Sequence, residues 1–419
     1  MSGKENLEKY TNETFKRTIT KVNDRIYHFF SIGHSSPIAI IADNSVILID
    51  ATESPDALEE IMLEIAKITE KPIKTLIYTH GHPDHRGGSG ALRGIVDDII
   101  AFAPADKQMR FYDEINDVLF QRGIRQFGSK LTNDEAISQG IGLRELYTQG
   151  KRPYDILPPT TVFDKEIVET VIDGVPLVMK RVGGEAPDEI FVWLPEDRVM
   201  CCADNYYACW PNLYAILGTQ YRDISIWVDA LTEILSYEPD VLLPGHTQPL
   251  IGKELIQEQV GTYRDAIDWV LHETLACANA GLSLDEAAEH VRLPEELRSK
   301  SYLQEFYGTV EWSVRSIYVG YLGWFDGRPE ALYPAPRSKM RACLLELVGI
   351  DNLIAKIDEL IEAGENQLAL ELMSIAEDNT DIRERKIAAL RARADEVDSA
   401  NGRHYLISCA RDLETEANR

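Results

Sequence analysis

Apolar residues recur with two different periods along the first part of the chain. Runs rich in Ile, Val and Phe predict strands at 25–30, 37–41, 46–50 and 75–79. Over 55–69 the apolar residues instead recur every three or four positions, which predicts a helix with one buried face. The order of strand, helix and strand predicts an α/β fold built in layers. In such folds the functional side chains gather at strand ends.

The pattern then becomes irregular before strands return. Residues 105–165 carry repeated glycines and a Pro-Pro break, and long irregular segments of this kind often line a pocket. We therefore expect this segment to shape the substrate site. Strands are predicted again at 198–203 and 241–244, and each ends close to a side chain that can bind a metal. These side chains are Asp204 and His246.

From about residue 255 the apolar spacing is helical throughout. Helices are predicted over 255–276, 284–290 and 310–322, with two or three more toward the C-terminus. We therefore divide the chain into an α/β domain at residues 1–270 and a helical domain at residues 271–419. A chain of 419 residues is long enough for two domains with a large buried core.

The densest cluster of metal-binding side chains directly follows the strand at 75–79. Four of them stand within six positions: His80, His82, Asp84 and His85. The glycine and the proline between them stop the strand, so the four side chains lie on a loop at its end. Two histidines two residues apart can hold one ion, and the adjacent aspartate and histidine fall to a second. This arrangement is typical of a two-metal hydrolytic site.

The remaining histidines and the cysteines lack such neighbours. We interpret five histidines as satisfied core or surface residues, namely His28, His34, His272, His290 and His404. The six cysteines are scattered, and we interpret the local group of Cys201, Cys202 and Cys209 as packing residues. A metal site would favour Cys-x-x-Cys pairs. Reduced thiols in a chain of this size favour a cytoplasmic location.

Composition narrows the classes of partner. A formal net charge of -26 and a pI near 4.8, without a basic stripe, argue against nucleic acid as a partner. The first residues are polar and predict no signal peptide. We expect no membrane span, because the chain contains no apolar run of about eighteen residues.

The loop at 78–88, with the strand at 46–50 before it, resembles the metallo-β-lactamase superfamily. Members bind one or two metals, usually zinc, on a strand-end loop of this pattern, within an αββα sandwich. A narrower resemblance is to the alkylsulfatase family (type III sulfatases), because residues 185–189, Glu-Ala-Pro-Asp-Glu, are similar to its Glu-Ala-Pro-x-Glu segment. The block at 318–329, Tyr-Val-Gly-Tyr-Leu-Gly-Trp-Phe-Asp-Gly-Arg-Pro, adds a second specific match.

The resemblance implies a set of seven zinc ligands. One zinc would be bound by His80, His82 and Glu185, and a second by Asp84, His85 and His246. Asp204 would bridge the two ions, at a position where the family usually has Glu. Asp84 or Asp204 would also orient the attacking hydroxide, which makes them the catalytic candidates. Asp50 is either a turn residue or a carboxylate that orients a ligand or braces the loop, and the two alternatives remain open.

Two departures from the family pattern concern the sulfate-binding residues. The family has a sulfate-binding Arg five residues after the position of Asn212, where this chain has Leu217. The family's sulfate-binding His aligns with Trp312. A sulfo group in a dry pocket needs charged donors, so Arg86 is considered as a replacement, although it can equally be a surface residue. The candidate substrate-binding residues are therefore Arg86, Asn212, Leu217 and Trp312.

The resemblance implies a binuclear zinc hydrolase with two Zn2+ per chain, which cleaves sulfate esters of alkyl alcohols with a metal-bound hydroxide. The alternative is the same zinc centre retargeted to a non-sulfate ester or another small electrophile, because the sulfate-binding Arg and His are replaced. A third hypothesis, an assembly protein with a vestigial site, is disfavoured by the complete ligand set. The helical region implies dimerisation, so we expect a homodimer.

Overall fold

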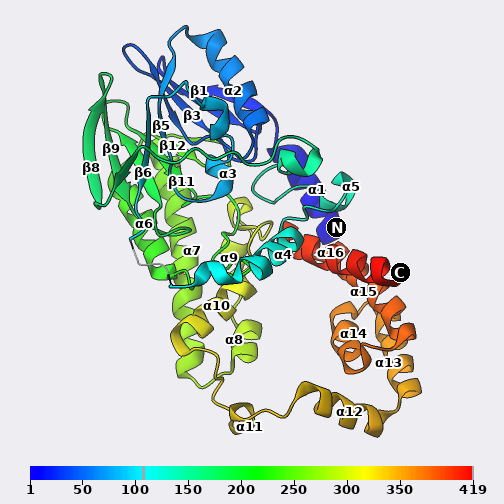
Figure 1. Cartoon of the computed structure of the whole chain (residues 1–419). Coiled ribbons are helices and arrows are strands. Elements are labelled where there is room, and N and C mark those ends of the chain that lie inside the picture. The colour runs from blue at the N-terminus through cyan, green and yellow to red at the C-terminus, as the bar shows by residue number, and fades with distance from the viewer. Residues whose placement is uncertain (106–108, 418–419) are drawn as a thin grey trace.

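Two sheets lie face to face in the N-terminal part of the chain, and helices cover both outer sides (Figure 1). The computed structural model describes residues 1–105 and 109–417. Seven strands form the first sheet in sequence order: β1 (Thr18–Lys21), β2 (Ile26–Phe30), β3 (Ile38–Ile41), β4 (Val46–Ile49), β5 (Ile73–Ile77), β6 (Asp98–Phe102) and β7 (Thr161–Phe163). The second sheet runs from β13 to β8: β13 (Leu250–Ile251), β12 (Val241–Pro244), β11 (Val199–Ala203), β10 (Ile190–Leu194), β9 (Val175–Arg181) and β8 (Ile167–Ile172).

The space between the sheets is filled by apolar side chains from both. Ile40 and Ile47 of the first sheet belong to one buried cluster with Met179 and Val192 of the second. Successive side chains of a strand point to opposite faces, so the remaining apolar residues of these strands face outward toward helices. The strands are therefore apolar on both sides, as expected for sheets buried between layers.

Each outer face of the sandwich is covered by its own helices. Leu58 and Ile61 of α2 (Pro55–Ile68) pack against Leu76 of β5. On the other side α6 (Ile224–Ser236) and α7 (Lys253–Asn279) cover the second sheet, with Trp227 packed against Phe191. This arrangement confirms the predicted αββα sandwich.

The strand ends that carry the predicted ligands meet at one edge of the sandwich. β4 and β5 are parallel, as are β11 and β12. The carboxyl ends of each parallel pair therefore point the same way. Asp50 follows β4 and His80 follows β5, while Asp204 and His246 follow β11 and β12.

The segment expected to be irregular contains a helix of its own. α4 (Asn116–Gln126) lies along α16 (Ala400–Ala417), the C-terminal helix. Arg125 of α4 pairs with Asp412 at 2.8 Å, and the buried ring of His404 lies 3.0 Å from the Gln126 carbonyl oxygen. The sequence did not predict this helix because its apolar residues are few and its packing partner is distant along the chain.

The N-terminal segment forms an ordered helix although its first residues are polar. α1 (Gly3–Thr14) begins with a capping box, in which Ser2 and Glu5 bond each other's backbone N–H groups. Leu7 is buried, and the ring of Tyr10 stacks on Phe306 with 4.0 Å between centroids. The packing partner Phe306 lies far along the chain, in the connection before α10.

The helical part extends from the sandwich as an open arm that returns to it (Figure 1). Its helices are α8 (Leu284–His290), α9 (Glu295–Arg298), α10 (Val310–Leu322), α11 (Pro329–Leu332), α12 (Arg337–Val348), α13 (Ile350–Glu362), α14 (Asn366–Met373) and α15 (Thr380–Glu396), before α16. The returning helices α13 to α15 have a small core of their own around Ile357 and Met373. The predicted domain boundary at residue 270 falls inside α7, a single helix of 27 residues.

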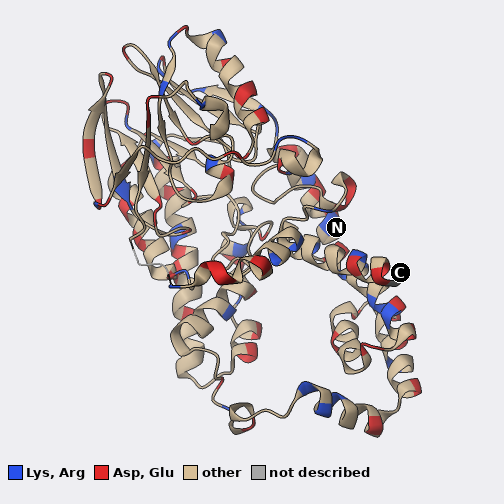
Figure 2. Ribbon diagram, in the orientation of Figure 1, with Lys and Arg blue, Asp and Glu red and all other residues tan. Residues whose placement is uncertain are grey.

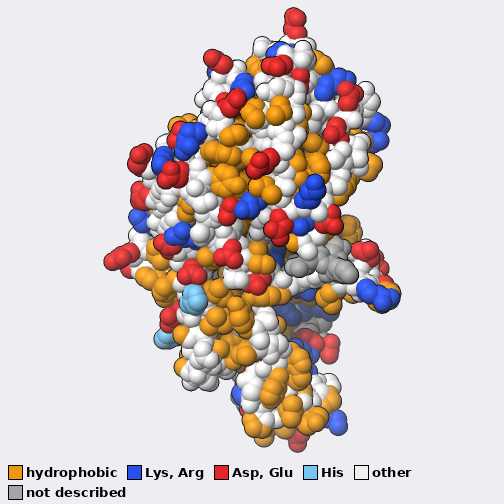
Figure 3. All heavy atoms as spheres, turned by 90° about the vertical axis from the view of Figure 1, so that its left-hand side faces the viewer, with side chains coloured by type: hydrophobic (Ala, Val, Ile, Leu, Met, Phe, Trp, Pro, Cys, Tyr) orange, Lys and Arg blue, Asp and Glu red, His pale blue; other side chains and the backbone are white. Residues whose placement is uncertain are grey.

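The surface carries charge of both signs. Lys and Arg are interspersed with Asp and Glu over the sandwich and the helices alike (Figure 2). Within residues 1–105 and 109–417, no helix combines the length and the apolar character needed to cross a membrane. On the face shown in Figure 3, hydrophobic side chains lie over the upper part of the molecule and also gather at its lower end. The helices α11 and α12 lie at this end in Figure 1.

Candidate metal centre

Asp50 connects the end of β4 to the loop that follows β5. Its backbone adopts the left-handed region, with φ of 59°, which turns the side chain toward the loop. Oδ1 accepts a hydrogen bond from the Thr79 backbone N–H at 2.8 Å, and Oδ2 accepts one from the Thr79 hydroxyl at 2.8 Å. Oδ2 also lies 2.7 Å from Nδ1 of His85. These contacts brace the loop, which is one of the two roles considered for Asp50.

Hydrogen bonds to the far side of each ring set the tautomers of His85 and His246. Nδ1 of His85 donates to Asp50, and Nδ1 of His246 donates to the His34 carbonyl oxygen at 3.2 Å. In the neutral rings both Nε2 atoms therefore carry lone pairs. These two atoms face each other at 3.1 Å, and each lies 3.2 Å from a carboxylate oxygen of Asp204.

His80 and His82 form the neighbouring half of the site. Thr79 donates its hydroxyl hydrogen to Asp50, so its oxygen accepts the hydrogen of His80 Nδ1 at 3.0 Å. The lone pair on His80 Nε2 then points at His82 Nδ1, 3.0 Å away, and at Asp204 Oδ2, 3.8 Å away. Glu185 Oε1 lies 4.0 Å from His82 Nδ1.

Asp84 approaches the second pair of histidines. Its Oδ2 lies 3.3 Å from Nε2 of His246 and 3.7 Å from Nε2 of His85. Asp84 and His85 share the short helix α3 (Pro83–Arg86), whose first residue is the proline that ended the strand. The structure thus brings together all seven residues that the sequence named as metal ligands.

The chemistry of these donors fits a pair of metal ions. Ligand atoms of one ion bound at about 2.0–2.2 Å lie roughly 3–4 Å apart, as the facing pairs do here. Among the described residues, Oδ1 of Asp204 and Oε2 of Glu185 are buried without a hydrogen-bond partner. Buried acceptors that face one another need a cation between them. The residues present therefore fit a divalent metal on either side of Asp204.

The buried histidines and carboxylates of the site shift one another's pKa. Burial alone would lower the pKa of His85, but Asp204, Asp50 and Asp84 raise the pKa well above its usual value. Burial likewise opposes protonation of His246, yet Asp204 and Asp84 raise its pKa to about 10. Burial would raise the pKa of both Asp84 and Asp204, but the charged histidines hold each pKa below its usual value.

Close backbone packing and a buried carboxylate hold the predicted metal ligands in position. A Cβ atom at Gly245 would lie 2.3 Å from Oδ1 of Asp204, so only glycine lets the chain reach His246. Glu189 is completely buried and accepts the backbone N–H of Glu185 and of Asp204, each at 2.9 Å. Its two oxygens therefore position two of the predicted ligands, a role that its place in the Glu-Ala-Pro-Asp-Glu segment did not reveal.

Comparisons with known proteins find relatives of both parts of the chain. The metallo-beta-lactamase superfamily matches residues 32–246, and the alkyl sulfatase dimerisation family matches residues 283–416. A linear primary-alkylsulfatase of a Pseudomonas species is 33% identical over 393 residues, which cover 90% of this chain and 73% of the relative. An alkyl/aryl-sulfatase of Saccharomyces cerevisiae is 28% identical over 361 residues, or 82% of this chain and 55% of the relative.

The chain belongs to the alkylsulfatase family of the metallo-β-lactamase superfamily. Membership confirms the predicted assignment to metal-dependent hydrolases. The fold agrees with a solved alkylsulfatase as well. The stereoselective inverting sec-alkylsulfatase Pisa1 from Pseudomonas sp. superposes with a TM-score of 0.86 at 24% identity, over 97% of this chain and 67% of that one.

A cavity of about 560 Å³ opens beside the first half of this alkylsulfatase-family site. His82 and Glu185 lie in its wall, and residues 219–223 form another side. Arg222 donates from Nη1 to Oε1 of Glu185 at 2.9 Å and to the Asn212 carbonyl oxygen at 2.6 Å. Burial raises the pKa of Glu185 to about 7 against the lowering effect of Arg222. The sequence analysis did not name Arg222 as a site residue, because nothing in its local sequence places it in the cavity.

Two of the predicted substrate-binding residues lie away from this cavity. The backbone N–H of Leu217 donates to Oε1 of Gln126 at 2.7 Å, and its side chain is not part of the cavity wall. Trp312 lies on α10 in the wall of a second cavity of about 420 Å³, which none of the seven predicted ligands lines. The sequence placed both by alignment alone, whereas the packing of α4 and α16 decides where they lie.

The other two candidate substrate-binding residues, Asn212 and Arg86, differ in their surroundings. Asn212 is buried beside Arg222, and its Oδ1 has no partner among the described residues. Arg86 is held by its own loop, because its guanidinium donates to the Gly81 carbonyl oxygen and lies 5.7 Å from the centre of the Tyr78 ring. Arg86 is therefore engaged in bracing the loop. Arg181 and Arg222 both line the cavity, and Arg222 is the one that contacts Glu185.

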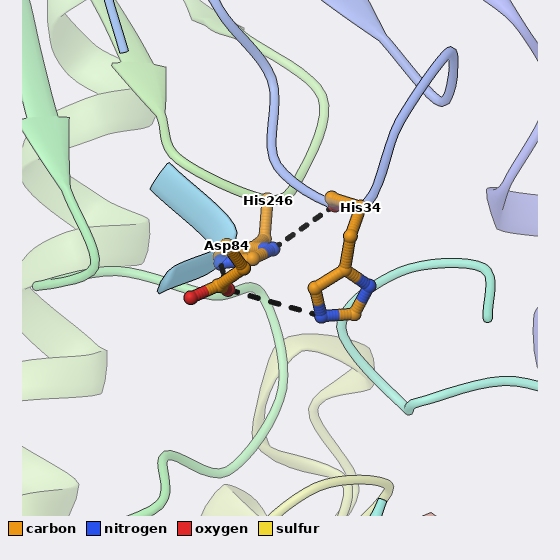
Figure 4. A group of neighbouring side chains, drawn as sticks. All are labelled: His34, Asp84 and His246. Atoms are coloured by element: carbon orange, nitrogen blue, oxygen red, sulfur yellow. Dashed lines mark hydrogen bonds and ion pairs between the residues drawn. The ribbon is translucent and has the colours of Figure 1, made fainter. Parts of the chain in front are cut away.

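Four of the five histidines interpreted as satisfied core or surface residues fit that interpretation. His28 and His404 are buried with ring hydrogen bonds to backbone carbonyls, and His272 and His290 are exposed. His34 differs, because its ring lies next to Asp84 and His246 (Figure 4). His34 is buried and hydrogen-bonded, as expected of a core residue, but its ring also lies against two of the predicted metal ligands. Nothing in the local sequence around His34 indicated this contact.

Proposed function

We propose that the chain is a binuclear zinc hydrolase that cleaves sulfate esters of alkyl alcohols. The observation that carries this proposal is the convergence of histidine nitrogens and carboxylates around Asp204, beside an open cavity. In our assignment His80, His82 and Glu185 bind the first zinc, Asp84, His85 and His246 bind the second, and Asp204 bridges them. The similarity to enzymes named alkylsulfatases supports the choice of substrate class.

Two bound zinc ions would supply an activated water and stabilise charge on the reacting ester. The chain itself would orient that water, because Asp84 and Asp204 have carboxylate oxygens at the centre of the site. Tyr207 donates its hydroxyl hydrogen to Oδ2 of Asp204 at 3.2 Å and fixes the orientation of that carboxylate. Asp50 and Glu189 hold the ligands in place through the hydrogen bonds described above.

Arg222 favours a sulfate ester over a neutral ester. A sulfo group carries a negative charge, and burying it in a cavity needs a fixed cation with several N–H donors. Arg222 offers this on the cavity wall beside Glu185, although the family's Arg position holds Leu217. Tyr221, Pro187 and Ile226 line the same cavity and offer apolar surface to an alkyl chain.

We further propose that the enzyme is a cytoplasmic homodimer whose catalytic part ends within α7. The cytoplasmic location is supported by six cysteines that are all free. Dimerisation is supported by the family match over residues 283–416 and by large apolar side chains exposed on the arm. These include Tyr321, Leu322, Trp324, Tyr333, Met340 and Leu347. Exposed apolar surface of this kind is commonly buried by a second copy.

Release of sulfate from primary and secondary alkyl sulfates tests the proposed activity. The full-length protein, purified free of metal and reloaded with zinc, is assayed beside a carboxylic ester and a phosphate ester. Sulfate release far above that of the metal-free protein, with about two zinc ions bound per chain, is the expected result. Turnover of the carboxylic or phosphate ester without turnover of sulfates would assign the same centre to another substrate.

A further inference from the structure

The connection between β2 and β3 places one more histidine against the proposed second metal. His34 is 6% exposed, and its Nδ1 lies 2.8 Å from the carbonyl oxygen of Leu143. A carbonyl oxygen only accepts, so the ring hydrogen of neutral His34 sits on Nδ1 and the lone pair sits on Nε2. That Nε2 points at Oδ2 of Asp84, 3.9 Å away (Figure 4).

Two acceptors therefore face each other, one on the buried His34 and one on the partly buried Asp84. The Nε2 lone pair of His34 and the carboxylate of Asp84 gain nothing from this approach unless a cation lies between them. The same Oδ2 atom is 3.3 Å from Nε2 of His246. His34, Asp84 and His246 each offer one ligand atom, and the three atoms lie within 4.8 Å of one another.

The surrounding chain holds His34 in this orientation from both sides. The buried Glu53 accepts the backbone N–H of His34 at 2.7 Å. The same carboxylate accepts the hydroxyl of Thr52 at 2.6 Å and the N–H of Leu146 at 3.2 Å. The carbonyl oxygen of His34 in turn accepts the Nδ1 hydrogen of His246. His34 thus orients the predicted ligand His246 through its backbone, and its own ring points at the same proposed metal position.

The chain at residues 142–143 leaves room for the His34 ring. A Cβ atom at Gly142 would lie 2.8 Å from Nδ1 of His34, so a residue with a side chain would push the ring away. The Leu143 carbonyl that sets the tautomer follows directly. This part of residues 105–165, expected to shape the substrate site, therefore also fixes a ring beside the proposed metal.

We propose that His34 binds the second metal through Nε2, as an additional protein ligand beside Asp84 and His246. This inference rests on the proposed binuclear centre. An added neutral nitrogen donor would retain that ion more firmly and occupy a coordination position otherwise open to water. The two metal positions would then differ, with the ion near His34 held by more protein ligands than its neighbour.

Two substitutions separate the role of Nε2 from that of the rest of the ring. In His34→Asn the short amide can still donate to the Leu143 carbonyl but offers no atom at the Nε2 position. In His34→Gln the longer side chain places an amide oxygen near that position. His28→Gln is the matched control, because His28 is also fully buried and bonds only a backbone carbonyl through its ring. His246→Ala serves as the reference for loss of a ligand of the proposed centre.

The measurement is metal content and cobalt absorption of the full-length variants. Each protein is dialysed against graded concentrations of a chelator, its zinc is counted, and Co2+ is then bound in place of zinc. We expect His34→Asn to lose one of two ions at a chelator concentration about 10-fold or more lower than the unsubstituted protein. Its cobalt spectrum should change with coordination number, while His34→Gln recovers part of the loss and His28→Gln behaves as the unsubstituted protein.

The outcomes distinguish this inference from the function on which it rests. His34→Asn could retain both ions and an unchanged cobalt spectrum while His246→Ala loses metal. That result would overturn the ligand role of His34 and leave the proposed metal centre standing. Retention of both ions in both variants would overturn the proposed metal centre as well. Circular dichroism of each variant confirms that a lost ion does not reflect a lost fold.

Discussion

Oδ2 of Asp50 accepts the Nδ1 hydrogen of His85 at 2.7 Å, and through this contact β4 sets the orientation of a ring on the loop after β5. The same carboxylate bonds Thr79 twice, so one side chain orients both ends of the ligand loop. A histidine that binds metal through Nε2 depends on such a partner at Nδ1 to fix its tautomer and ring direction.

Replacing Asp50 by Asn should therefore weaken metal binding without unfolding the protein. The amide removes the charge that supports His85 and Thr79. We expect zinc affinity to fall about 10- to 100-fold, measured by competition with a chromophoric chelator. Asp24→Asn, a change at a fully exposed carboxylate in the turn between β1 and β2, is the matched control. Equal zinc affinity in the Asp50→Asn protein and its control would show that Asp50 is only a turn residue.

Arg222→Gln should reduce hydrolysis of alkyl sulfates much more than hydrolysis of a neutral ester. A hydrogen bond to a charged group contributes about 1.5–3 kcal/mol, so kcat/KM for sulfates should fall about 10- to 150-fold. Initial rates with paired sulfate and carboxylic esters measure the difference. Arg315→Gln, at an exposed ion pair on α10, is the control. An equal loss with both esters would instead assign Arg222 to positioning Glu185.

Zinc binding should release protons and strengthen as the pH rises above 7. Against the effect of burial, the neighbouring carboxylates raise the pKa of His246 to about 10 and also raise the pKa of His85, so protons are held in this cluster at pH 7. A ligand must be unprotonated, so protons compete with zinc below these pKa values. We expect release of about two protons per chain at pH 7, from calorimetric titrations in buffers of different ionisation enthalpy. Heats that are independent of the buffer would contradict this linkage.

Substitution of two exposed residues on the arm should weaken the proposed dimer. Trp324 and Leu347 are 73% and 77% exposed, and a second copy would bury them. In Trp324→Ser with Leu347→Ser we expect the dimer dissociation constant to rise about 10-fold or more, measured by sedimentation over a concentration series. Leu63→Ser changes a similarly exposed leucine on α2 and should leave the dimer unchanged. An unsubstituted protein that sediments as a monomer would contradict the proposed homodimer.

The ligand loop and most of the sandwich were predictable because their signals are local. Four ligands stand within six residues, and the glycine and proline between them end a strand whatever the rest of the chain does. The strands β3, β4, β11 and β12 are short apolar runs, and helix α2 has an apolar face at regular spacing. Asp204 and His246 follow because residues at the ends of parallel strands meet at one edge of a sheet.

The positions of His34, Arg222 and Trp312 depended on contacts that no local pattern encodes. His34 meets His246, more than two hundred residues away along the chain, because the β2–β3 connection and the end of β12 reach the same edge of the sandwich. Arg222 enters the cavity by the path of the chain before α6, and Trp312 is placed in a separate cavity by the packing of α10 near α16. Residue types and spacing specify the strands and the loop, whereas side chains from distant segments become neighbours only when the layers pack together.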